Sequence, residues 1–311
     1  MSGKNAGEAR SVLDRLKTLA RKDGVDPQIM QIRYGHERFL YRLSRTPAAD
    51  QFILKGAMLM VAWFGETLRP TRDIDLLGFG DVSETGLLTA LRTICGVEVE
   101  FDGMEYDPET IQIEEIRNED EYGGRRVTLV GFLGASRILI QIDIGVGDAV
   151  APPAEYIDYP SLLDLPTPRL RGYRKETAIA EKLHAMVRLG EINSRMKDFF
   201  DVYMLASRNS FEEDALRVAI RATFERRTTS IPIAVPSVFT RQFATAPERQ
   251  TQWKAFLNRN SLDAVPVEFS HVMPVVAEFL WPVLEDHFPT VGPPRTWKAG
   301  EGWIPSAKLP P

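Results

Sequence analysis

The spacing of apolar residues changes twice along this chain of 311 residues. Over residues 8–22 and 26–44, apolar side chains recur every three or four positions, as in helices that bury one face. From residue 71 to 150 the period shortens, and segments such as "TRDIDLLGF" and "SRILIQIDIGVGD" have the character of strands. After Pro160 the helical period returns. This order predicts an α+β fold, in which flanking helices accompany a small mixed sheet and a mainly helical C-terminal domain follows.

Glycine, proline and the changes of period set the expected boundaries. We expect one helix from Gly56 to near Gly65, another at residues 83–95, and strands at 71–79, 96–102, 125–133 and 136–148. Pro274 and Pro282 interrupt the apolar segment 265–285, which predicts two shorter helices there. The expected organisation is N-terminal helices at 1–49, a core at 50–155, a helical domain at 156–290 and an irregular tail at 291–311.

Composition excludes several classes of protein. The net charge of −5 and the pI near 5.6 give no overall attraction to nucleic acid, so such a contact would need a local basic patch. Cys95 is the only cysteine, which excludes a disulfide framework and a cysteine-based zinc site. No run approaches the roughly 18 apolar residues of a membrane span, and the polar N-terminus lacks the apolar core of a signal peptide. We therefore expect a cytoplasmic protein without membrane contact.

Two aspartates stand one residue apart on a predicted strand. Asp73 and Asp75 flank Ile74, so they point to the same side, where two like charges repel each other. Asp143 occupies a second strand between Ile142 and Ile144, where an unpaired charge would be costly. Three carboxylates at one point would form an oxygen site for Mg²⁺, or for Mn²⁺ in its place. An Asp-x-Asp pair alone is more often a solvated edge of a sheet.

Small and basic residues precede the acidic pair. Gly56 and Ala57 open the predicted helix after Lys55; glycine lets a phosphate approach the backbone, and free amides at a helix start favour anions. The positions just before the aspartates add further candidates for nucleotide binding: Arg69, Thr71 and Arg72. Without the aspartates, Gly56 and Ala57 would indicate only a helix start.

Three segments together resemble the AbiEii/AbiGii toxin family, within the nucleotidyltransferases that share the DNA polymerase β-like fold. They are "LKGAMLM", the string "RPTRDIDL" that ends at Leu76, and "AIAEKLHAMVRLGEINSRMKDFFDVYML". The resemblance implies that Lys182 and Asp198 join Asp73 and Asp75 as catalytic residues. It departs from the family at Ala57, where a second glycine or a serine is usual. A surface ion pair between Lys182 and Asp198 is the alternative interpretation.

The resemblance also implies a function. Such toxins use an NTP and a divalent metal to add a nucleotide to RNA, at the 3′ end of tRNA, which blocks translation; a separately encoded antitoxin restrains them. The helical domain would complete the active site and bind the acceptor. The basic run 169–175 could bind RNA and stack a base on Tyr173, or could be a solvated lead-in to a helix. Two alternatives stay open: nucleotidylation of a protein hydroxyl, and a catalytically idle protein that binds a nucleotide or a partner.

Overall fold

The computed structural model describes residues 3–116, 123–262, 265–285 and 293–306. The chain divides into two units, which we describe separately. The first contains Met1–Asp148 and Ala154–Gly172, and the second contains Ala149–Pro153 and Tyr173–Pro311. The predicted α+β fold class is confirmed. The predicted boundaries differ from these units, because the N-terminal helices belong with the sheet and the first unit continues beyond residue 155.

A mixed sheet of seven strands forms the first unit, in the order β3-β4-β5-β2-β1-β7-β6. The strands are β1 (Phe52–Lys55), β2 (Ile74–Gly78), β3 (Met104–Ile116), β4 (Gly124–Leu133), β5 (Ser136–Val146), β6 (Glu155–Asp158) and β7 (Arg169–Gly172). Two of the pairings, β2 with β5 and β1 with β7, are parallel, and the others are antiparallel. The strands expected at 71–79, 125–133 and 136–148 are confirmed as β2, β4 and β5.

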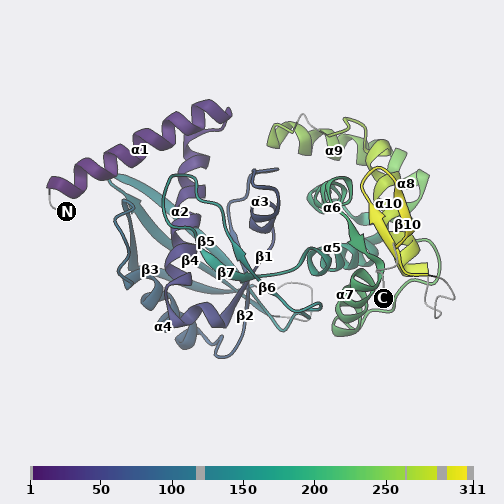
Figure 1. The fold of residues 1–311 in the computed structure, drawn as a ribbon, viewed down its shortest axis with the longest axis horizontal. Helices are drawn as coiled ribbons and strands as arrows, with labels where there is room; N and C mark the ends of the chain where they lie inside the picture. The colour runs from purple at the N-terminus through teal and green to yellow at the C-terminus, as the bar shows by residue number, and fades with distance from the viewer. Residues whose placement is uncertain (1–2, 117–122, 263–264, 286–292, 307–311) are drawn as a thin grey trace. The chain divides into compact units, whose positions relative to one another are not determined.

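Helix α2 packs on one face of this sheet (Figure 1). The helices of the unit are α1 (Gly3–Asp23), α2 (Pro27–Ser44), the short 3₁₀ helix η1 (Pro47–Gln51), α3 (Met58–Phe64) and α4 (Glu84–Gly96). Asp26 caps α2 by accepting the amide of Gln28 at 2.6 Å. Gly35 permits the close packing, because a Cβ there would lie 3.0 Å from Cδ1 of Ile140 on β5.

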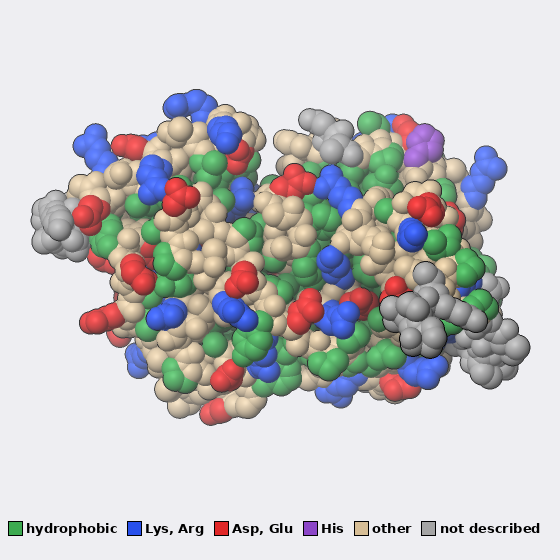
Figure 2. Space-filling model, viewed as in Figure 1, with side chains coloured by type: hydrophobic (Ala, Val, Ile, Leu, Met, Phe, Trp, Pro, Cys, Tyr) green, Lys and Arg blue, Asp and Glu red, His purple; other side chains and the backbone are tan. Residues whose placement is uncertain are grey.

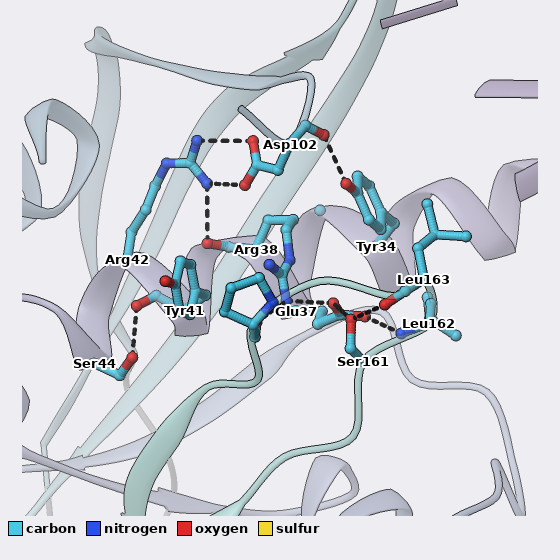
Figure 3. A network of polar contacts seen from close by, with 12 residues as sticks. Tyr34, Glu37, Arg38, Tyr41, Arg42, Ser44, Asp102, Ser161, Leu162 and Leu163 are labelled. Atoms are coloured by element: carbon cyan, nitrogen blue, oxygen red, sulfur yellow. Dashed lines mark hydrogen bonds and ion pairs between the residues drawn. The ribbon is translucent and has the colours of Figure 1, made fainter. Parts of the chain in front are cut away.

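The strand expected at residues 96–102 is wrong, because polar side chains of α2 hold this segment as a loop. Arg42 donates to both carboxylate oxygens of Asp102, at 2.6 and 3.0 Å. The hydroxyl of Tyr34 donates to the carbonyl of Asp102 at 2.6 Å (Figure 3). These groups are buried, so breaking the contacts would leave a charge without a partner. Strand β3 follows instead, and its register shifts between Asp107 and Gln112, around Pro108.

Buried polar contacts also explain why the first unit extends to Gly172. Arg38 and Glu37 of α2 are 1% and 0% exposed and form an ion pair at 2.5 Å. Glu37 accepts hydrogen bonds from the Ser161 hydroxyl and the Leu162 amide, both at 2.8 Å (Figure 3). The loop between β6 and β7 is thereby fixed to α2. From the sequence we predicted the boundary at 155/156, because the prolines between residues 152 and 168 are typical of a linker.

The second unit is mainly helical. Its elements are α5 (Lys175–Leu189), η2 (Gly190–Ile192), α6 (Met196–Arg208), β8 (Phe211–Glu212), α7 (Glu213–Arg226), η3 (Ser237–Phe239), α8 (Arg241–Thr245), α9 (Pro247–Asn260), α10 (Phe269–Glu285), β9 (Arg295–Lys298) and β10 (Gly302–Pro305). Phe199, Trp253 and Phe269 are fully buried and their rings pack together in its core. Among the described residues, no helix is long and apolar enough to cross a membrane.

Two predictions for the end of the chain are wrong. Residues 269–285 form one helix that contains Pro274 and Pro282, because eight buried apolar side chains along it outweigh the lost backbone hydrogen bonds. The tail is a hairpin rather than irregular over its described part. Trp297 on β9 is buried and donates its indole N–H to the carbonyl of Ala206 at 2.7 Å. Trp303 on β10 donates to the carbonyl of Phe279 at 3.1 Å, so both strands are anchored to helices of the unit.

Candidate active site

Three carboxylates converge in the first unit, as the sequence predicted. Asp73, Asp75 and Asp143 each offer an oxygen within 4.8 Å of the others, and all three side chains are half-buried. Asp75 on β2 lies in register with Asp143 on the parallel strand β5, while Asp73 lies just before β2. The set contains only oxygen donors and carries three negative charges. This donor chemistry fits a hard divalent cation. We call these residues the aspartate triad.

The triad belongs to a row of charged residues that runs across the sheet. Lys55 on β1 stands in register with Asp75, and Asp75 with Asp143. On the other side of Asp143, β4 places Arg126 in register, and β3 places Glu114 beside Arg126. Residues in register on neighbouring strands project from the same face of a sheet. The row therefore carries a cation on each side of the Asp75 and Asp143 pair.

Neighbouring residues fix two of the carboxylates. The hydroxyl of Thr71 donates to Oδ1 of Asp73 at 2.5 Å, so this predicted nucleotide-binding residue orients a carboxylate. Gly56 has a φ of +72°, and a Cβ built there would lie 1.9 Å from Oδ2 and 2.7 Å from Cβ of Asp75. The space left by the missing side chain at Gly56 is thus filled by Asp75. From the sequence we had expected a phosphate to approach the backbone at this glycine.

The other predicted nucleotide-binding residues lie at the end of β1, just before α3 and in the loop before β2. Ala57 is buried and immediately precedes α3, which has only seven residues. Arg69 is half-buried and Arg72 is exposed. Lys55 donates to Oδ2 of Asp148 at 2.6 Å, and both side chains are largely buried. The sequence analysis did not find this ion pair, which joins the end of β1 to the loop after β5.

Arg126 was also missed, although it contacts one carboxylate of the triad through two hydrogen bonds. Its Nε and Nη2 donate to the two oxygens of Asp143 at 2.8 and 2.7 Å. This hydrogen bonding raises the pKa of Arg126, with Asp73 as a further contributing charge. The cross-strand register between the two segments is the signal that could have found Arg126, since an arginine opposite an aspartate on paired strands reads as an ion pair.

Lys182 and Asp198 lie in the second unit, where they form a cluster of their own. Lys182 on α5 contacts Asp198 at 3.3 Å and Asp201 at 2.7 Å, and both carboxylates lie on α6. Asp198 is 2% exposed, and burial alone would raise its pKa, but Lys182 and Arg195 hold that pKa below its usual value. Arg195 contributes a hydrogen bond to Asp198 at 2.6 Å. This is therefore a buried cluster rather than the surface ion pair of the alternative interpretation.

The structure excludes one proposed role in the basic run 169–175. Tyr173 is fully buried and its hydroxyl donates to Glu181 at 3.2 Å, so it cannot stack on an RNA base. His184 is buried, with Nε2 2.9 Å from the Thr229 hydroxyl and its ring against Phe224. In the first unit, Arg169 lies over the exposed ring of Tyr156, 5.7 Å from its centre.

Comparison with known protein families shows to which family a chain with this fold and this site belongs. Residues 38–275 match the sequence model of the nucleotidyl transferase AbiEii toxin family of type IV toxin–antitoxin systems. The chain belongs to the AbiEii family. It is therefore a nucleotidyltransferase toxin of a type IV toxin–antitoxin system, and this membership implies an NTP substrate and an antitoxin partner. The match contains the triad and the cluster around Lys182, as the resemblance in the sequence indicated.

A solved structure shares the fold of this AbiEii protein. MenT4, a nucleotidyltransferase toxin from Mycobacterium tuberculosis, superimposes with a TM-score of 0.59 at 18% identity, over 88% of this chain and 90% of MenT4. JHP933 from Helicobacter pylori gives a TM-score of 0.49 at 16% identity, over 84% of this chain and 93% of JHP933. No protein of curated function matches the chain.

Proposed function

We propose that this toxin transfers a nucleotide from an NTP to the 3′-terminal hydroxyl of an RNA, with tRNA as the preferred acceptor, and so blocks translation in the cytoplasm. The observation that carries the proposal is the convergence of Asp73, Asp75 and Asp143 within 4.8 Å. The triad would hold Mg²⁺ or Mn²⁺, because hard cations prefer carboxylate oxygens.

The reaction is an in-line displacement at the α-phosphorus of the NTP. The acceptor hydroxyl oxygen forms a bond to this phosphorus, while the bond to the α,β-bridging oxygen breaks and pyrophosphate leaves with its electron pair. The hydroxyl proton passes to a carboxylate of the triad. Bound divalent metal would supply neutralisation of the phosphate charge and polarisation of the attacking hydroxyl.

Residues of the first unit would position the NTP. Thr71 keeps Asp73 oriented through the hydrogen bond of 2.5 Å. Lys55, Arg69 and Arg72 offer positive charge from β1 and from the loop before β2 to the triphosphate. Gly56 and Ala57 would contribute backbone amides at the start of α3.

We propose that the second unit contributes Lys182 and Asp198 to catalysis and binds the acceptor. Lys182 carries its charge beside two buried carboxylates, which fix the position of its ammonium group. A positioned ammonium can stabilise charge that develops on the phosphates during transfer. Asp198 would act with Asp201 to hold that ammonium in place.

Local features, rather than net charge, support an RNA acceptor. On the face shown in Figure 2, basic and acidic side chains of the described residues are interspersed. An RNA acceptor would therefore bind to this face through local contacts and not through a broad positive electrostatic field. The exposed Tyr156 with Arg169 over its ring offers an aromatic surface beside a cation. Unpaired RNA bases stack on such surfaces, and the phosphates pair with arginine.

The proposal is tested by incubating the purified protein with total tRNA, Mg²⁺ or Mn²⁺, and each α-³²P-labelled NTP separately. We expect label in the tRNA band, and none with tRNA whose 3′ hydroxyls have been oxidised by periodate. Asp75→Asn should remove the transfer, whereas Asp158→Asn, which alters an exposed aspartate on β6, should not. Label on protein would favour nucleotidylation of a protein hydroxyl, and transfer that survives periodate would exclude the 3′ end.

A further inference from the structure

The contact between Arg126 and Asp143 uses the oxygens that Asp143 would offer to a metal. Both oxygens of Asp143 accept from one guanidinium, at 2.8 and 2.7 Å. Two parallel hydrogen bonds between a guanidinium and a carboxylate are stronger and more directional than one. The Arg126 side chain is 42% exposed and that of Asp143 is 19% exposed, so solvent reaches one side of the pair.

A divalent cation and this guanidinium compete for the same carboxylate. A metal that binds the triad would approach the positive charge of Arg126 across a short distance, in a half-buried place where screening by water is weak. The guanidinium must therefore leave Asp143, at least in part, when the metal enters. Its partial exposure gives the long side chain room to turn away without disturbing the buried face of β4.

Once displaced, Arg126 needs another anion. Glu114, in register on β3, is exposed, and an exposed ion pair contributes little. The triphosphate of an NTP carries several negative charges and would lie next to the metal it shares with the triad. It is the anion best matched to an arginine fork at this position.

We propose that Arg126 is the internal counter-ion of the aspartate triad. Its guanidinium binds Asp143 until metal and NTP arrive together, and the side chain then turns so that the guanidinium contacts the triphosphate. The inference rests on the proposed function, because it assumes that the triad binds metal and that an NTP shares that metal. Arg126 thereby couples metal loading to nucleotide binding. It also keeps the triad from holding metal tightly when no substrate is present.

The test measures Mn²⁺ binding without any turnover, from the electron paramagnetic resonance signal of free Mn²⁺. Without nucleotide, Arg126→Ala should bind Mn²⁺ about tenfold more tightly than the wild type, since one opposing charge has been removed. Arg125→Ala is the matched control. Arg125 neighbours Arg126 on β4 but pairs with Glu115 at 3.0 Å, so its removal should leave Mn²⁺ affinity unchanged.

The second arm adds α,β-methylene analogues of the four NTPs, which bind but cannot be cleaved. In the wild type the bound analogue should raise Mn²⁺ affinity by about tenfold more than it does in Arg126→Ala, because only the wild type gains a new partner for the displaced guanidinium. Arg126→Lys should fall between the two, since an ammonium cannot form the paired contact.

The outcomes separate the inference from the proposed function. If Mn²⁺ binding depends on Asp75 but Arg126→Ala binds no more tightly than the wild type, the counter-ion role is wrong and the metal site stands. If neither protein binds Mn²⁺, the metal site fails and the inference fails with it. Thermal unfolding of Arg126→Ala and Arg126→Lys establishes that each variant is folded, so that a change in affinity reflects the site.

Discussion

Asp75 and Asp143 lie in register on the parallel strands β2 and β5, and so place two carboxylates side by side on one face of the sheet. Two neighbouring charges of the same sign raise the free energy of the folded protein unless a cation lies between or beside them. In this structure Arg126 supplies one such cation to Asp143, at 2.7 Å. The folded chain is thus prepared for a positive group at this point.

Replacing Asp75 by asparagine should abolish nucleotide transfer without loss of stability. The amide has nearly the shape of the carboxylate, but it removes one metal ligand and one of the repelling charges. We expect kcat to fall by about 10³-fold or more, while the melting temperature stays the same or rises. EDTA should silence the wild type equally. Substantial transfer by Asp75→Asn, or in EDTA, would contradict the metal site.

Expression of the wild-type chain without its antitoxin should arrest bacterial growth. Because we attribute the arrest to transfer, Asp75→Asn and Asp73→Asn should permit growth at equal protein levels, measured by immunoblot. Asp158→Asn should arrest growth like the wild type, since this aspartate is exposed on β6. If the Asp75 variant arrested growth equally, toxicity would have to arise from an activity other than transfer.

The strands and helices with a strong period could be predicted from the sequence, and those fixed by long-range contacts could not. β5, with its run of buried isoleucines, and α2, with Asp26 and Pro27 at its start, carry local signals. The loop before β3 has the alternation of a strand, but its conformation depends on Arg42 and Asp102, which are 60 residues apart. In the same way, α10 tolerates its prolines because of the core around it.

The site shows the same division. Asp73, Asp75 and Asp143 could be found because carboxylates on apolar strands are costly and therefore conspicuous. Arg126 and Asp148 were missed, because their importance appears only once the neighbouring strands and their register are known. The contact between Asp201 and Lys182 could not be predicted either, because it depends on the packing of α5 against α6.

Gly56→Ala should disturb Asp75 more than it disturbs the fold. The residue has a φ of +72°, and the added methyl group would collide with the Asp75 side chain, whose Cβ lies 2.7 Å away. We expect a loss of stability of about 1–2 kcal/mol from the backbone conformation and a much larger loss of Mn²⁺ affinity and kcat. Gly65→Ala, at the end of α3 with a φ of +71° and open space around it, is the control. It should lose similar stability but keep its Mn²⁺ affinity.

His36 should make the stability of the protein depend on pH. It is 1% exposed, its ring nitrogens have no hydrogen-bond partner within the described chain, and burial lowers its pKa to about 4, against a weaker opposing effect of Asp73. Between the ordinary histidine pKa of 6.5 and pH 4, the unfolded chain binds a proton that the folded chain does not. The free energy of unfolding should therefore fall by about 3 kcal/mol as the pH drops across this interval.

Urea unfolding at several pH values measures this contribution. His36→Phe should remove it, since phenylalanine fits a buried position and cannot bind a proton. The control is His271→Phe, because His271 is exposed on α10. A pH dependence in His36→Phe equal to that of the wild type would show that other groups cause it.

Lys182 should contribute to both stability and catalysis, and a double variant separates the two roles. Lys182→Met leaves Asp198 and Asp201, which are 2% and 0% exposed, without the ammonium group that both carboxylates contact. Removing one partner from such a buried set typically costs about 3–5 kcal/mol. Arg195→Met is the matched control: its side chain is 49% exposed and it contacts the same Asp198, so we expect a loss below about 1 kcal/mol.

Adding Asp201→Asn to Lys182→Met removes one of the two buried carboxylates that lost the ammonium group, and should recover most of the lost stability. If Lys182 acts only by holding α5 and α6 together, the double variant should also recover kcat. If its ammonium stabilises the transferring phosphoryl group, kcat and kcat/KM should stay about 10²-fold below the wild type despite the recovered fold. Single-turnover assays below the melting temperature of each variant distinguish these results. We expect the stability to return and the rate to stay low, because Lys182 holds its charge beside Asp198 with only 15% of its side chain exposed.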